Sequence, residues 1–147
     1  MPIKPENRGR YPANWRQIRA GILERAGNRC EACRVPQYAV AQWDGERWKL
    51  TAGNAYHDQL QYAGSYREAR ELAAHNSEYW EPGDPKWIVI VLTVAHLDHT
   101  PENCDPANLR AWCQRCHLRY DAKFHQANAA KTRKARKAVG DLFERLA

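Results

Sequence analysis

Residues 92–121 read LTVAHLDHTPENCDPANLRAWCQRCHLRYD, and this stretch decides the fold that we expect for the chain. It begins within an apolar, β-branched run at 87–94, which predicts one buried strand. A polar loop at 101–106, a short strand at 109–112 and a long helix from residue 117 onward follow in that order. The stretch therefore predicts mixed α and β structure, of the α+β class.

Towards the N-terminus, a helix is expected over residues 15–26. Asn14 stands where an N-cap would, and Gly27 gives the stop signal. One stripe of this helix is apolar, which favours core packing over a binding face. The stripe consists of Trp15, Ile18 and Ile22.

The middle of the chain, residues 35–86, is expected to be an insertion with two elements of its own. An apolar pattern at 40–50 surrounds the turn signal Asp44-Gly45 and predicts a hairpin. A capping-box pattern at 65–68 predicts a short helix that ends at about residue 74.

Four of the five cysteines form two Cys-x-x-Cys pairs, Cys30 with Cys33 and Cys113 with Cys116. The first pair follows the N-terminal helix, and the second lies between a strand and a helix. Four thiolates at this spacing predict a closed, tetrahedral and therefore structural zinc site. Redox pairs or buried apolar cysteines are the alternatives, and the duplication of the pair favours the metal. Cys104 is expected to be a free thiol in a loop.

Charge is distributed unevenly along the chain. Residues 1–34 carry a net +5, residues 35–118 carry −4 and residues 119–147 carry +5. Basic ends favour a polyanionic partner such as DNA, because neutralised phosphates release counterions. A solvated helix face is the alternative reading of the same charges. The basic run expected to contact DNA consists of Lys131, Arg133, Lys134, Arg136 and Lys137.

The quoted stretch resembles the HNH, or His-Me finger, nucleases of phages and bacteria. Their pattern is a histidine after a strand, then an Asn-Leu pair, then Cys-x-x-Cys-His at the next helix. His96, Asn108 and the segment 113–117 match that pattern in order and spacing. The resemblance implies a small ββα-metal, treble-clef-like core held by the four-cysteine zinc site, with an N-terminal and a long C-terminal helix.

The resemblance also implies an activity, that of a metal-dependent DNA endonuclease that nicks or cuts both strands. His96 would be the general base, since a neutral histidine can deprotonate water at physiological pH. Asn108 would orient that base through the backbone. His117 would bind the catalytic divalent ion, which is Mg²⁺, Mn²⁺, Ni²⁺ or Zn²⁺.

One position departs from the family pattern. Ala95 stands where many members have Asp or His as a second metal ligand. Asp98, which follows the base, and Asp121, one turn beyond the helix histidine, are nearly equal candidates to replace it. His99 is a third candidate ligand and the first alternative base, because Asp98-His99 also looks like the Asp-His pair of other members.

At 147 residues the chain is expected to be one domain. Its parts are the first helix and cysteine pair (1–34), the insertion (35–86), the HNH motif (87–121) and the basic C-terminal helix (122–147). No apolar stretch reaches the ~18 residues of a membrane span, so we expect a cytoplasmic protein of a bacterial or phage-infected cell, without membrane partners.

Two other functions compete with the nuclease. A non-catalytic zinc module with a decayed HNH site would bind nucleic acid without cutting it, and Ala95 is the best argument for it. A protein-interaction adaptor built on the acidic, tryptophan-rich middle would show no salt-dependent DNA binding.

Overall fold

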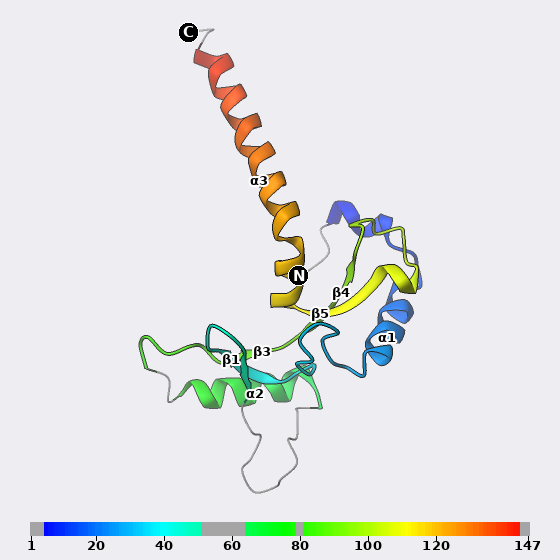
Figure 1. Cartoon of the computed structure of the whole chain (residues 1–147), viewed down its shortest axis with the longest axis vertical. Coiled ribbons are helices and arrows are strands. Elements are labelled where there is room, and N and C mark those ends of the chain that lie inside the picture. Colours follow the sequence, from blue (N-terminus) through cyan, green and yellow to red (C-terminus); the bar gives the residue numbers. More distant parts are fainter. Residues whose placement is uncertain (1–4, 51–63, 79–80, 145–147) are drawn as a thin grey trace, which may run out of the picture. The chain divides into compact units, whose positions relative to one another are not determined.

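The computed structural model describes residues 5–50, 64–78 and 81–144. The chain forms two compact units, Met1–Gln114 and Arg115–Ala147, and each is described by itself. Ten helices and strands are defined among the described residues (Figure 1). In chain order they are η1 (Pro5–Arg10), α1 (Trp15–Arg25), β1 (Val40–Trp43), β2 (Trp48–Leu50), α2 (Tyr66–Ser77), β3 (Ile88–Val89), β4 (Leu92–His96), η2 (Pro106–Asn108), β5 (Leu109–Cys113) and α3 (Gln114–Glu144).

Helix α1 confirms the predicted N-terminal helix. Asn14 occupies the N-cap position, but its side chain makes no capping hydrogen bond. The helix stops where Gly27 adopts a φ of +60°, a left-handed conformation that glycine reaches without a steric cost. Asn28 N–H then donates to Leu23 O at 2.9 Å, which closes the helix end.

A three-stranded sheet in the order β2-β1-β3 forms one part of the first unit, and α2 packs against β1 and β3. The predicted hairpin is confirmed, with Trp43 opposite Trp48 and their ring centroids 5.1 Å apart. Helix α2 begins at the predicted cap, where Ser65 Oγ accepts Glu68 N–H. It continues to Ser77, beyond the predicted end, because nothing in its sequence breaks the helix at residue 74.

The apolar run at 87–94 was predicted to be one buried strand, and this prediction is wrong. The run is divided into β3, which pairs with β1, and β4, which pairs with β5 in a second sheet. Non-local partners hold the chain where it passes from β3 to β4. Ile90, between the strands, donates its N–H to Ala39 O at 2.8 Å, and Leu92, the first residue of β4, donates its N–H to the Gln37 side chain at 2.9 Å. Ile88 is 40 % exposed, so the run is not buried throughout.

The second sheet is the antiparallel pair β4–β5, in register from Leu92 opposite Cys113 to His96 opposite Leu109. Helix α1 packs against both strands, and Arg19 donates from α1 to Leu92 O at 3.2 Å. The largest fully buried side chains of the described core are Ile90, Leu92, Leu109, Cys30 and Cys113. Apolar burial, the main favourable term in folding, thus includes both strands of this sheet and Cys30 of the first cysteine pair.

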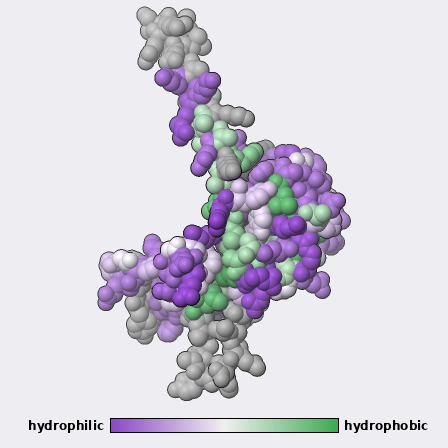
Figure 2. All heavy atoms as spheres, viewed as in Figure 1, coloured by the Kyte–Doolittle hydropathy of each residue, from purple (hydrophilic) through white to green (hydrophobic). Residues whose placement is uncertain are grey.

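The second unit consists of α3 beyond its first residue. The helix has 31 residues and begins at Gln114, before the predicted start. Figure 2 shows hydrophilic and hydrophobic residues interspersed along the coloured part of this helix. Among its described side chains, the exposed large apolar ones are Leu118, Tyr120 and Phe124. Among the described residues, none of the helices combines the length and apolar character needed to cross a membrane.

Candidate functional site

The four paired cysteines come together as predicted. Cys30 and Cys113 are fully buried, Cys33 is exposed and Cys116 is half-buried in the first turn of α3. Their sulfur atoms all lie within 4.8 Å of one another. The two pairs are thus positioned to hold one metal ion.

The geometry of these sulfurs fits zinc. Tetrahedral Zn–S bonds of ~2.3 Å place two sulfurs roughly 3.8 Å apart, and Cys33 Sγ lies 3.7 Å from Cys113 Sγ. Cys113 N–H donates to Cys30 Sγ at 3.4 Å. Hydrogen bonding from the Cys113 thiol lowers the pKa of Cys30 far below its ordinary value, against burial, which raises it. Because metals bind the thiolate, this environment favours the ligating form.

His96 ends β4 and is 9 % exposed. Its ring stacks on Trp15 at 5.2 Å between centroids, and Tyr11 meets it edge-on at 5.8 Å. Cys104 Sγ lies 3.8 Å from His96 Nε2. Burial lowers the pKa of His96, opposed by the nearby negative charges of Asp98 and Glu102. Burial therefore favours the neutral form of the imidazole.

Asn108 lies in η2 and bonds the loop that follows His96. Its carbonyl accepts Leu97 N–H at 2.9 Å, and its side-chain Oδ1 accepts Asp98 N–H at 3.2 Å. Its amide Nδ2 donates to Asp98 Oδ1 and to Asn103 O, each at 2.9 Å. The predicted orienting residue is thus joined by backbone and side chain to the two residues that directly follow His96.

Asp98, a candidate metal ligand, is engaged inside this loop. Its carboxylate accepts Thr100 N–H at 2.9 Å, Asn103 Nδ2 at 2.7 Å and Asn108 Nδ2. The hydrogen bond from Asn108, followed by those from Thr100 and Asn103, lowers the pKa of Asp98 to about 2. The carboxylate therefore organises the loop. His99, the third candidate, is exposed at a φ of +57°.

In the second unit, His117 and Asp121 lie one helical turn apart, as expected from their spacing. His117 Nε2 is 3.2 Å from Asp121 Oδ2, and His125 Nε2 is 3.8 Å from the same oxygen. His125 was not predicted to belong to this group. Its spacing of four residues from Asp121 could have indicated it, because residues four apart share one face of a helix. Ala95 is buried in β4 and offers no ligand atom.

The predicted DNA-binding run lies on α3. Arg133, Lys134 and Lys137 are exposed, so their side chains are available to a partner. The side chains of Lys131 and Arg136 lie outside the described residues.

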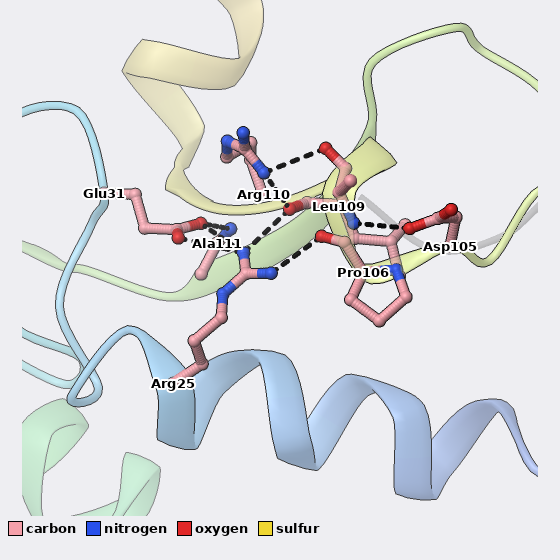
Figure 3. Close-up of polar contacts among 8 residues, drawn as sticks. Arg25, Glu31, Asp105, Pro106, Leu109, Arg110 and Ala111 are labelled. Atoms are coloured by element: carbon pink, nitrogen blue, oxygen red, sulfur yellow. Dashed lines mark hydrogen bonds and ion pairs between the residues drawn. The ribbon is translucent and has the colours of Figure 1, made fainter.

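Several residues around the site were not found from the sequence, because their partners are far away in the chain. Arg10 pairs with Glu102 through Nε–Oε1 at 2.6 Å, which ties the N-terminal segment to the loop after β4. Arg25 and Glu31 link α1, the first cysteine pair and β5 (Figure 3). Only the position of Glu31 inside a Cys-x-x-Cys pair could have drawn attention to it.

Comparisons of the chain with protein-family models, with curated proteins and with solved structures found no match. The resemblance to HNH nucleases therefore stays a prediction from the motif residues themselves.

Proposed function

We propose that this protein is an HNH-type, metal-dependent DNA endonuclease with a structural zinc. The observation that carries the proposal is the bonding of Asn108 to Leu97 and Asp98, directly after the buried His96. A general base must be neutral and held in a fixed orientation. Burial favours the neutral form of His96, and the bonds of Asn108 fix the loop that follows it. These two features support the assignment of the base to His96.

The remaining residues of the motif complete the chemistry. The cysteine pairs would hold zinc as a structural ion, while His117 would bind the catalytic divalent ion. That ion, when bound, supplies charge stabilisation to the phosphate and its leaving oxygen. Of the two replacement ligands, Asp121 fits better, since it already lies beside His117 whereas Asp98 is engaged within the loop.

The test is incubation of the purified protein with supercoiled plasmid, with and without Mg²⁺, Mn²⁺ or Ni²⁺. Conversion to nicked or linear DNA is expected only with metal. His96→Gln should lower cleavage by ~10² or more, the usual effect of losing a positioned base, while zinc content and DNA affinity stay unchanged. His117→Ala should in addition raise the metal concentration required.

His75→Ala on α2 is the matched control, because His75 is an exposed histidine beside a carboxylate, Glu78 at 3.6 Å. It should cut at the parent rate. A His96→Gln protein that also cuts at the parent rate would contradict the assignment and make His99 the next candidate.

A non-catalytic DNA-binding module is the second candidate, and buried Ala95 favours it because this position supplies no metal ligand. Tight, salt-dependent DNA binding without cleavage under any of the three metals would establish the binder instead of the nuclease.

We expect the basic run of α3 to contact phosphates rather than base edges. Replacing Lys134 and Lys137 by Gln should weaken binding to all DNA sequences equally. It should also reduce the slope of log binding constant against log salt concentration by roughly one for each lost phosphate contact. Equilibrium titrations at several salt concentrations measure this. A loss confined to one DNA sequence would show a base-reading role.

A further inference from the structure

From the contacts of Arg25 and Glu31, we infer that this pair transmits the order of the zinc site to the loop beside His96. They are positioning residues, and their catalytic meaning rests on the proposed function. The contacts themselves do not depend on it.

Glu31 forms the first link. It lies between Cys30 and Cys33, and its backbone N–H donates to Ala111 O at 2.9 Å. Its carboxylate Oε2 accepts Ala111 N–H at 2.7 Å. Since Ala111 lies two residues before Cys113, Glu31 fastens the first cysteine pair to the strand that carries Cys113 of the second pair.

Arg25 forms the second link (Figure 3). Its Nη2 donates to both carboxylate oxygens of Glu31, at 2.9 and 3.1 Å, and to Leu109 O at 2.8 Å. Its Nη1 donates to Pro106 O at 2.7 Å. These two carbonyls bracket Asn108 in sequence. A guanidinium can satisfy all three groups because its donors form a rigid, planar fork, which a lysine lacks.

Asn108 forms the third link, through its bonds to Leu97 and Asp98. A continuous path of hydrogen bonds thus runs from the cysteine pair through Glu31, Arg25 and η2 to the residues after His96. Arg110 supports η2 separately, donating to Ala107 O and Leu109 O at 3.1 and 2.8 Å. Its contacts do not reach the cysteines, so the zinc-dependent part of the path is carried by Arg25 and Glu31.

Hydrogen exchange of the Leu97 and Asp98 amides tests the inference, because these amides bond Asn108 rather than either member of the pair. Arg25→Lys and Glu31→Gln should each accelerate their exchange about tenfold, with one zinc per chain retained. Chelation of zinc should accelerate the same amides. In cleavage assays kcat should fall while KM stays constant, since DNA binding is untouched.

Arg67→Lys is the matched control, because Arg67 also pairs with a glutamate, Glu71 at 3.1 Å, but on α2. It should leave the loop amides unchanged. The double variant Arg25→Lys with Glu31→Gln should exchange no faster than the stronger single variant, as expected of two residues on one path.

The inference is overturned if the Ala111 amide exchanges faster in Glu31→Gln while the Leu97 and Asp98 amides keep the parent rate. The pair would then stabilise only the residues that it contacts directly. Additive effects in the double variant would also overturn it. If the parent protein cuts no DNA, the proposed function fails, and the exchange data still decide the role of the pair.

Discussion

In both antiparallel hairpins of the first unit, an aspartate side chain between the strands accepts backbone N–H groups, but the two aspartates differ in their other partners. In β1–β2, Asp44 Oδ1 accepts the N–H groups of Glu46 and Arg47, at 2.9 and 2.7 Å, and so builds a tight turn from neighbouring residues. In the loop between β4 and β5, Asp98 likewise accepts a nearby N–H, but it also bonds Asn108, ten residues away.

Long-range contacts add to this difference. Arg10, Arg25 and Glu31 reach the second hairpin from 80 to 92 residues away. The hydrogen bonds that Asp44 accepts in its turn come from within three residues, and its ion pair with Lys49 spans five. A turn that only reverses the chain needs local bonds, whereas a loop that must hold His96 in one geometry is bonded from several elements. The number of non-local bonds therefore distinguishes the loop that carries the candidate catalytic residue from an ordinary turn.

The largest expected effect comes from removing a ligand of the zinc. Cys113→Ser should abolish stoichiometric zinc and, because zinc binding can supply folding free energy on the order of 10 kcal/mol, loosen β4–β5. Hydrogen exchange should become fast there and stay slower in β1–β2, whose bonds do not involve the cysteines. Metal analysis and exchange measure this. Native protein without zinc, with every thiol titratable, would refute the metal site, and equal loosening of both hairpins would remove the contrast between them.

An intermediate effect on cleavage is expected from replacing Asp98, and none from replacing Asp44. Asp98→Ala should lower cleavage by about 10- to 10²-fold, because the loop after His96 loses its internal bonds and catalytic geometry is sensitive to small displacements. Asp44→Ala should leave the cleavage rate unchanged and accelerate exchange only in its own turn. Equal rates for the two variants would show that the Asp98 loop is no more important to activity than an ordinary turn.

A smaller effect concerns pH. Burial under Trp15 helps to lower the pKa of His96, so in Trp15→Ala this pKa should rise towards its ordinary value. Because the base must be neutral, the acidic limb of the kcat profile should move to higher pH. In the parent protein, the stability that depends on neutral His96 is present above the ordinary histidine pKa and is lost as pH falls below it.

NMR titration of the His96 ring measures this shift without relying on cleavage. Trp43→Ala, in the first hairpin, is the control and should leave the titration in place. An unchanged His96 titration in Trp15→Ala would show that other groups determine its protonation.

Features that depend on neighbouring residues could be predicted from the sequence. The end of α1 at Gly27, the Asp44-Gly45 turn and the cap at Ser65 each follow from bonds made within five residues. The grouping of the four cysteines was also predictable, because the duplication of the Cys-x-x-Cys pair favours a shared metal over redox pairs or buried apolar cysteines. Mixed α and β structure followed from the apolar patterns, while the ββα-metal identity of the core stays part of the proposal.

The meeting of distant segments could not be predicted in this way, because it depends on how the whole chain packs. The run at 87–94 has the pattern of one strand, and its division follows from bonds to Ala39 and Gln37, which no local pattern encodes. The enclosure of His96 by Trp15 and the link from Arg25 to η2 have the same origin. Periodicity reports which face of a segment is apolar, but the partner that covers that face is chosen by packing of the whole chain.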